Sequence, residues 1–140
     1  DSDADGHAAF LWWLLHACFL LGTQVNDPED KHPEYRRDTL GAAHLSKLEV
    51  EMQRIEAGLD LPRSFLVSAG TLLAAEADVT ATVARDFERA LVRLAETVPA
   101  FNAATLLVFA NRLGDYFFLL ARALERGRHL PVDYGVLDAD

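Results

Sequence analysis

The chain has 140 residues, enough for one domain, and 51% of them are hydrophobic, which is ample for a core. Alanine and leucine dominate while glycine and proline are few, and this composition favours an all-α fold. The net charge of −9 argues against a general nucleic-acid or anionic-membrane surface, because both need a positive field. The single cysteine, Cys18, cannot form an intrachain disulfide, which fits a reducing cytoplasm.

The first apolar run, from Ala8 to Leu21, is similar to the apolar core of a signal peptide. Its flank, DSDAD, is acidic where a secretory signal carries positive charge, and about 14 apolar residues fall short of the roughly 20 that cross a bilayer. We therefore expect a buried bundle helix that stops at Gly22. His16 is expected to be a packed side chain of this helix, with a haem or metal ligand as the weaker alternative. The absence of an initiating Met suggests a trimmed or incomplete chain.

Residues 23 to 38 carry two prolines and many charges without an apolar period, which predicts a surface loop. Within it, Glu29 and His32 have the Glu-x-x-His spacing of carboxylate-bridged metal sites. Those sites need the pair on a helix, and Pro28 and Pro33 disfavour a helix here. The sequence therefore predicts no metal site.

Two helices are expected next. The first begins near Asp38 or Thr39, either of which can cap, and runs to Gly58. The second spans about residues 68 to 96 and is closed by Pro99. The narrow apolar stripe of the first is formed by Leu45, Leu48, Met52 and Ile55, and alternating charges on its other side indicate a face in water.

The longest apolar run that also carries charges, Leu106 to Arg126, is expected to be the central helix. Its broad apolar face repeats three and four residues apart, at Leu106, Phe109, Leu113, Tyr116, Phe117, Leu120 and Leu124. Arg112 and Asp115 share another face, where they can pair within the helix or reach other helices. A solvated ion pair and a ligand site both remain open. With a loosely packed tail at about residues 127 to 140, the prediction is one all-α, up-down helix bundle over residues 1–140.

The helix expected at 68 to 96 carries Arg85 and Arg89 one turn apart, with Asp86 and Glu88 between them. These residues are either ordinary surface ion pairs or part of an anion site. In an anion site, two guanidinium groups on one face grip a polyphosphate while Glu88 orients one of them. The residues of this helix alone do not decide between the two.

FANRLGDYFFLLAR, in the central helix, resembles the last-helix signature of the ATP:cob(I)alamin adenosyltransferases of the propanediol-utilisation type. That signature runs Asn-Arg-Leu-Ser-Asp, then aromatic and aliphatic residues, then Ala-Arg, and only its Ser differs, at Gly114. Upstream, RSFLVSAG is similar to Lys/Arg-Ser-Phe-x-Leu-Pro-Gly-Gly, and TVARDFER is similar to Thr-Val-x-Arg-Arg-Ala-Glu-Arg. HACFLLG matches Gln-Asn-Asp-Leu-Phe-Asp-Leu-Gly at Phe19, Leu21 and Gly22.

The resemblance implies a ferritin-like helical bundle, usually a homotrimer, in which ATP (with Mg) and cobalamin meet between neighbouring subunits. It implies transfer of the 5′-deoxyadenosyl group of ATP to Co(I), with release of triphosphate. A Co(I) nucleophile needs little activation, so the protein mainly makes it accessible and places it. By position, Phe19 helps displace the lower axial ligand of the corrinoid. The implied catalytic residues are Phe19, Arg85 and Asp115, and the implied cofactor-binding residues are Arg63, Arg85, Glu88, Asn111 and Arg112; Asp115 alternatively makes an intersubunit ion pair.

The chain departs from this family pattern at several points. The phosphate-binding segment Thr-Arg-x-Gly-Asp-x-Gly-Thr-Thr and the helix after it are absent. Ala81 and Asp86 stand where the family has arginines, Ser68-Ala69 replaces Pro-Gly, and Leu20 replaces an acidic residue. Loss of positive charge weakens polyphosphate binding. Two functions are therefore expected: a cobalamin adenosyltransferase, or a non-catalytic bundle of the same fold that binds a corrinoid or a protein partner or serves as an assembly subunit.

Overall fold

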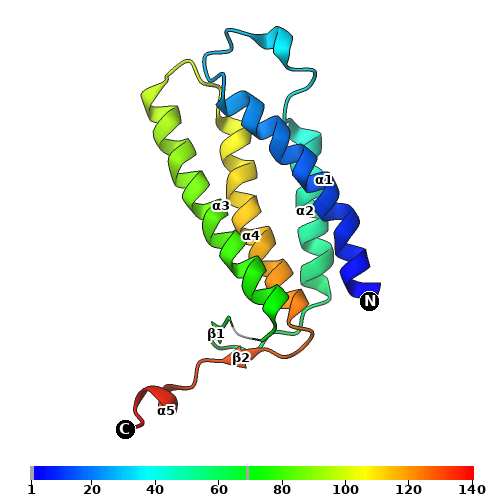
Figure 1. Cartoon of the computed structure of the whole chain (residues 1–140), viewed down its shortest axis with the longest axis vertical. Helices are drawn as coiled ribbons and strands as arrows, with labels where there is room; N and C mark the ends of the chain where they lie inside the picture. The colour runs from blue at the N-terminus through cyan, green and yellow to red at the C-terminus, as the bar shows by residue number, and fades with distance from the viewer. Residues whose placement is uncertain (1, 69) are drawn as a thin grey trace.

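A computed structural model describes residues 2–68 and 70–140, with side chains in the first helix from Gly6 onward. Four long helices run alternately up and down and form one bundle, which confirms the all-α prediction (Figure 1). Their bounds are α1 Ser2–Val25, α2 Ala42–Ala57, α3 Leu72–Thr97 and α4 Ala104–Leu124. The short elements are a 3-10 turn at Pro33–Tyr35, the strands β1 Leu66–Val67 and β2 Leu130–Pro131, and α5 Tyr134–Leu137.

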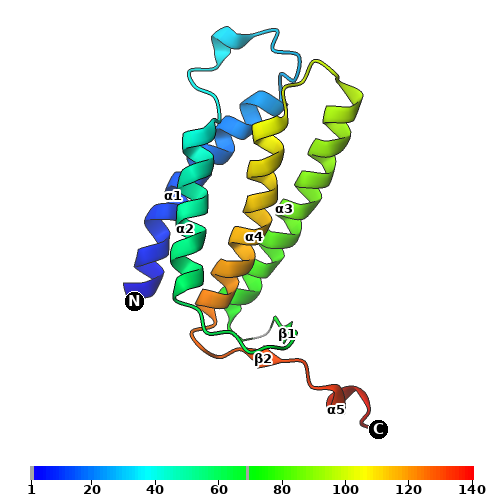
Figure 2. The same cartoon turned by 180° about the vertical axis from the view of Figure 1, so that it is seen from behind.

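The predicted central helix α4 forms the core of the bundle and contacts both α3 and α2 (Figure 2). Its apolar face is buried as expected, except that Phe117 and Leu124 are half-buried. α3 packs along α4, and four of its buried residues are alanines, Ala74, Ala77, Ala81 and Ala84, whose small side chains allow close helix packing. Because Ala81 is buried, an arginine at this position would have to displace the side chains packed around it.

All four long helices have boundaries that differ from the predictions. α4, expected from Leu106 to Arg126, runs from Ala104 to Leu124. α1 continues through Gly22 to Val25, and the loop after it covers residues 26 to 41. α2 begins after Gly41, because the ring nitrogen Nδ1 of His44 accepts the Gly41 N–H at 3.0 Å; neither Asp38 nor Thr39 caps the helix. α3 begins after Thr71, whose hydroxyl accepts the Ala74 N–H at 3.1 Å, four residues later than the predicted Ser68 start.

The C-terminal tail is anchored along its first half. β2 pairs antiparallel with β1, Leu66 opposite Pro131 and Val67 opposite Leu130. Beyond this ladder, the Val132 N–H donates to the Phe65 carbonyl at 2.9 Å. Both strands lie at the end of the bundle where α3 begins and α4 ends (Figure 1). The prediction of a loosely packed tail is therefore wrong for residues 130 to 132, while the exposed α5 agrees with it.

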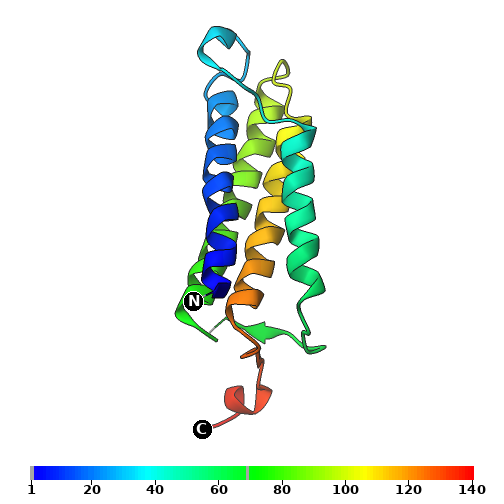
Figure 3. The ribbon, with the colours of Figure 1, turned by 90° about the vertical axis from the view of Figure 1, so that its right-hand side faces the viewer.

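α1 is the predicted bundle helix, lies along one side of the bundle (Figure 3) and is buried along one face only. Phe10, Leu14, Ala17 and Leu21 face the core, and the Phe10 ring lies 5.2 Å from that of Tyr116 on α4. By length and apolar composition, Gly6–Val25 and Ala104–Leu124 would each suffice to cross a membrane. The core helix of a bundle meets the same test, which accounts for α4; α1 meets it with only 22% of that stretch buried.

The loop after α1 is organised by Asp27. Its carboxylate accepts the backbone N–H groups of His32 at 2.9 Å and Lys31 at 3.0 Å, and the guanidinium of Arg36 at 2.9 Å. These donors stabilise the charged form, the two backbone N–H groups most, and lower the pKa of Asp27 to about 2. The carboxylate therefore holds the loop at neutral pH.

This contact predicts a loop that is sensitive to acid. A folded-state pKa below the ordinary 3.8 stabilises the fold above that value, and the contribution disappears as the pH falls through about 2. We expect the Lys31 and His32 amides to lose chemical-shift signatures of their hydrogen bonds between pH 4 and pH 2, followed by NMR. Asp27→Asn should show the loosened loop already at neutral pH; unchanged amide shifts in that variant would contradict the assignment.

Tyr116 carries a buried hydroxyl that has no hydrogen-bond partner among the described residues. Burial raises the pKa of this phenol above its ordinary value. We expect Tyr116→Phe to keep the ring packing and to leave the free energy of unfolding unchanged or raise it by about 1 kcal/mol, because it removes an unsatisfied polar group. Urea denaturation measures this, and a loss above about 1 kcal/mol would show that the hydroxyl is satisfied.

Candidate functional site

A line of polar side chains crosses the middle of the bundle from α2 to α3. On α4, Asn111 and Arg112 are adjacent and therefore diverge by about 100° around the helix. Arg112 reaches α2, where its Nε donates to Glu49 Oε1 at 3.3 Å. Asn111 reaches α3, where its Nδ2 donates to Glu88 Oε2 at 2.9 Å. Arg112 Nη1 also donates to Asn111 Oδ1 at 2.7 Å, so one hydrogen-bonded line joins three helices.

Arg85 lies one turn before Glu88 on α3 and bends across α4. Its Nη2 is 3.5 Å from Asp115 Oδ1, and both side chains are nearly half exposed. Gly114 permits this path, because a Cβ atom at that position would lie 3.3 Å from Arg85 Cγ. A side chain at this position, where the Asn-Arg-Leu-Ser-Asp signature has Ser, would require the Arg85 side chain to shift slightly.

Carboxylates accompany every arginine of this face. Arg89 pairs with Asp86 on the same helix, and both are exposed. Glu88 accepts a hydrogen bond from Asn111, and no hydrogen bond or ion pair joins it to Arg85 or Arg89 among the described residues. Its role in orienting a guanidinium stays a prediction. Arg112 pairs with Glu49 of α2 and Asp115 pairs with Arg85 of α3, so both residues reach other helices. The choice between a solvated ion pair and a ligand site stays open.

Two of the predicted site residues lie elsewhere. Arg63 is exposed in the segment between α2 and β1, at the end of the bundle where the strands pair (Figure 1). Phe19 is exposed on the outer side of α1. The structure thus brings five predicted site residues together where α4 packs against α2 and α3, and we call this group the polar seam: Arg85, Glu88, Asn111, Arg112 and Asp115. The roles assigned to Arg63 and Phe19 stay predictions.

Sequence reasoning missed a buried ionic cluster near the end of α4. The Arg122 side chain is 3% exposed and that of Glu125 is 0% exposed. Arg122 Nη2 lies 2.8 Å from Glu125 Oε1 and also contacts Asp78 of α3. The contact with Glu125 is an ion pair whose geometry does not meet the requirements of a hydrogen bond. Glu125 Oε2 lies 2.6 Å from His129 Nδ1. The sequence signal that could have predicted this cluster is the spacing of Arg122 and Glu125, which lie three residues apart beside the apolar face of α4.

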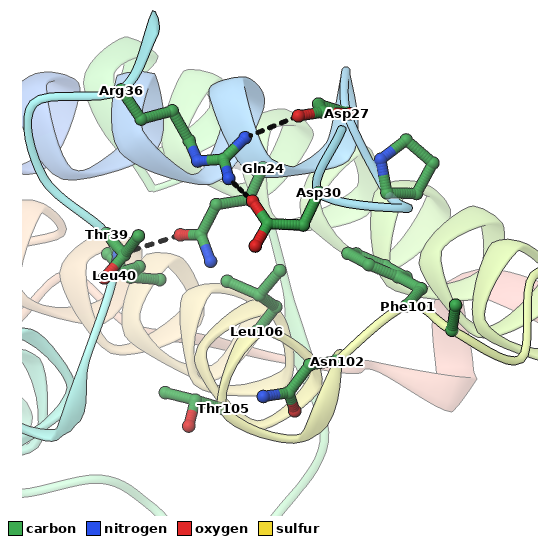
Figure 4. Close-up of a pocket in the computed structure, with 12 residues that line it drawn as sticks. Gln24, Asp27, Asp30, Arg36, Thr39, Leu40, Phe101, Asn102, Thr105 and Leu106 are labelled. Carbon is green, nitrogen blue, oxygen red and sulfur yellow. Dashed lines mark hydrogen bonds and ion pairs between the residues drawn. The ribbon is translucent and has the colours of Figure 1, made fainter. Parts of the chain in front are cut away.

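A separate cavity of about 340 Å³ lies at the opposite end, under the loop after α1 (Figure 4). The Arg36 side chain is 9% exposed, contacts Asp27 and Asp30, and keeps a buried Nε–H without a partner. Gln24 Oε1 accepts the Leu40 N–H at 2.8 Å, and Asn102 and Thr105 line the side formed by the start of α4. Because two carboxylates surround its one arginine, this cavity does not suit a polyphosphate.

Comparison of the sequence with known proteins identifies similar proteins of one family. The sequence profile of the family described as cobalamin adenosyltransferase matches residues 2–124. A cobalamin adenosyltransferase of Cupriavidus metallidurans is 33% identical over 126 residues, which are 90% of this chain and 63% of that protein. A corrinoid adenosyltransferase of Mycobacterium leprae is 30% identical over 81% of this chain and 59% of its own length. This chain therefore spans less than two thirds of these relatives.

A solved structure supports the fold. A variant of the PduO-type ATP:corrinoid adenosyltransferase of Lactobacillus reuteri, complexed with cobalamin and ATP, superposes with a TM-score of 0.78 at 24% sequence identity. The superposition covers 94% of this chain and 70% of that one.

Proposed function

We propose that this chain, which belongs to the cobalamin adenosyltransferase family, transfers the 5′-deoxyadenosyl group of ATP to the cobalt of a reduced corrinoid. The reaction class follows from two similar proteins, a cobalamin adenosyltransferase and a corrinoid adenosyltransferase. The observation that carries the proposal here is the hydrogen-bonded line of Glu88, Asn111 and Arg112, because it falls on the motifs that resemble the family and presents an amide and a guanidinium on one seam. In this reaction the bond from cobalt to C5′ forms, the C5′–O bond breaks, and triphosphate leaves.

The residues present suit the nucleotide side of this reaction. Glu88 fixes the Asn111 amide and Arg112 donates to its oxygen, so Asn111 is oriented before any nucleotide arrives. Arg85 is half exposed, and its contact with Asp115 is long. Such an exposed pair contributes about 0–1 kcal/mol, so a phosphate can compete for the guanidinium. ATP, taken as its magnesium complex, and the corrinoid are both substrates in this proposal.

The assembly and location belong to the same proposal. The family resemblance implies a homotrimer with its ligands between subunits, and the half-exposed polar seam suits a site that a neighbouring copy completes. The single Cys18 suits a cytoplasmic protein, and burial raises the pKa of its thiol, which disfavours a thiolate nucleophile. Sedimentation equilibrium tests the assembly, and a mass that is not a multiple of three chains would contradict the trimer.

A second function, a non-catalytic corrinoid-binding or assembly subunit of the same fold, is favoured by the arginine pairing. Asp86 pairs with Arg89 and stands where the family pattern has an arginine, and Ala81, at a second such position, is buried. At the two positions where the family pattern has an additional arginine, this chain therefore has a carboxylate, Asp86, or an uncharged side chain, Ala81. Polyphosphate binding is weakened on this side of the seam.

Calorimetric titration of Mg-ATP into the 140-residue chain, with and without cobalamin, separates the two functions. Micromolar binding would support a nucleotide site, and adenosyl transfer is then measured by the absorbance change of reduced cobalamin in the same samples. Absence of both heat and thermal shift would overturn the transferase proposal. Binding of cobalamin alone, without any ATP response, would favour the non-catalytic subunit.

A further inference from the structure

The cavity under the loop after α1 has an apolar floor. The first turn of α4 supplies Leu106, the loop supplies Leu40, and the turn between α3 and α4 supplies Phe101, and all three side chains are buried. Small-molecule sites in proteins are lined in this way, by apolar residues with a few placed polar groups, and have volumes of about 300–1,000 Å³. At about 340 Å³, this cavity suits a molecule of one ring rather than a nucleotide.

Arg36 supplies a hydrogen-bond donor that faces this cavity. Its side chain is 9% exposed, its Nη1 donates to Asp27 at 2.9 Å, and its Nη2 donates to Asp30. The Nε–H is buried and has no hydrogen-bond partner among the described residues. Because Nε–H and Nη2 share one edge of the planar guanidinium, the Nε–H faces the cavity beside Asp30 (Figure 4). A buried donor without an acceptor is costly, so an acceptor atom on a ligand would stabilise this arrangement.

Gln24 and Asp30 add a second donor and an acceptor to the same space. Gln24 Oε1 accepts the Leu40 N–H at 2.8 Å, which fixes the amide and turns its NH₂ group toward the cavity (Figure 4). Asp30 Oδ1 accepts from Arg36, and the other carboxylate oxygen points toward the cavity (Figure 4). The cavity therefore presents two donors beside one acceptor.

The charges around the cavity select an uncharged ligand. Among the lining residues, Asp27 and Asp30 carry two negative charges against the one positive charge of Arg36, so an anion is repelled. An ammonium group has no acceptor atom and would leave the Arg36 Nε–H unsatisfied. A hydroxyl group both accepts and donates, so neighbouring hydroxyls can accept from Arg36 and donate to Asp30.

We propose that this cavity binds a small uncharged polyol of one ring, such as a monosaccharide. Its hydroxyls bridge Arg36 and Asp30, while the C–H groups of its ring pack on Phe101 and Leu106. The site stands independently of the proposed adenosyl transfer, because the cavity shares no residue with the polar seam and lies at the end of the bundle opposite the strand pair.

Titration with D-glucose, followed by NMR, tests the proposal. The Arg36 Nε–H gives its own ¹H–¹⁵N signal, which Arg36→Lys identifies by removing it. This signal and the Leu40 amide should shift saturably, with a midpoint of roughly 1–10 mM. D-glucose 6-phosphate and cyclohexanol, which has one hydroxyl, should bind about tenfold more weakly. Signals that do not move at roughly 100 mM glucose would show that the Nε–H binds water only and would overturn the proposal. Tighter binding of the phosphate or of cyclohexanol would overturn the ligand class.

Two variants locate the binding at these groups. Gln24→Glu keeps an oxygen for the Leu40 N–H but replaces the NH₂ donor with an acceptor, so glucose binding should weaken by about tenfold. Asp30→Asn should weaken it similarly, and asparagine tolerates the positive φ of 54° at this position. Gln53→Glu, which makes the same change at an exposed position of α2, is the matched control and should keep the wild-type affinity. Wild-type glucose affinity in both cavity variants would overturn the proposal.

Discussion

Replacing Glu125 with alanine is expected to lower the free energy of unfolding by about 3–5 kcal/mol, because it leaves the buried Arg122 short of an acceptor. Glu125 is fully buried between Arg122 and His129, and Asp78 alone would then face the guanidinium. Removing one partner of a buried charge group costs far more than removing an exposed one, since water cannot replace it. No other single ionic substitution described here should destabilise the chain as much.

Urea denaturation of Glu125→Ala, followed by circular dichroism, measures this loss. Asp86→Ala is the matched control: it also removes the acidic partner of an arginine, but both groups are exposed, and the expected change is below about 1 kcal/mol. Glu125→Gln should fall between the two, because the amide keeps the shape and one acceptor oxygen. Equal losses for Glu125→Ala and Asp86→Ala would show that the cluster is solvated and that the burial argument is wrong.

The same cluster fixes the segment that precedes α3. Ser68 contacts Asp78, which in turn pairs with Arg122, and the Thr71 hydroxyl donates to the Leu124 carbonyl at 3.0 Å. Gly70 packs so tightly that a Cβ atom there would lie 2.7 Å from the Arg128 carbonyl oxygen. Because β1 also belongs to this segment, the buried charges hold the strand pair and the neighbouring Arg63 segment onto the bundle.

The helices were predictable where their apolar period is clean. α4 and α2 alternate apolar and charged positions at helical spacing, and their buried faces follow that pattern. In α1 almost every residue from Ala8 to Leu21 is apolar, so apolar and polar positions do not alternate. The sequence therefore did not show which side of α1 is buried and which is exposed. Two-residue strands carry no period at all, and β1 and β2 depend on contacts between residues far apart in the chain.

The sequence indicated which polar residues α3 and α4 carry, but not which of them meet. Asp86 and Arg89 form the local pair that their spacing suggested. Glu88 pairs with Asn111, 23 residues away, because α3 and α4 pack side by side in opposite directions, and no local spacing encodes that register. Arg85 likewise contacts Asp115, 30 residues away on α4, and its side chain passes close to Gly114. Helix packing therefore decides which predicted partners meet.

Asn111→Ala is expected to weaken the ATP response by about 10- to 100-fold, or to abolish adenosyl transfer, while the chain still folds. The amide links Glu88 to Arg112, so its loss removes a nucleotide contact and also frees the two side chains that orient it. One lost hydrogen bond to a charged group is worth about 1.5–3 kcal/mol, which corresponds to that range in affinity. The seam is only half-buried, so the free energy of unfolding should fall by no more than about 1 kcal/mol.

Asn102→Ala serves as the control, because Asn102 is exposed at the cavity near the start of α4 and lies outside the polar seam. Both variants are compared with wild type by Mg-ATP calorimetry and by the transfer assay, with urea denaturation alongside. An Asn111→Ala chain with wild-type ATP affinity would remove the seam from the nucleotide site. If Asn102→Ala weakened ATP binding instead, the nucleotide would belong to the cavity beside Arg36, whose unpaired Nε–H would then be its donor.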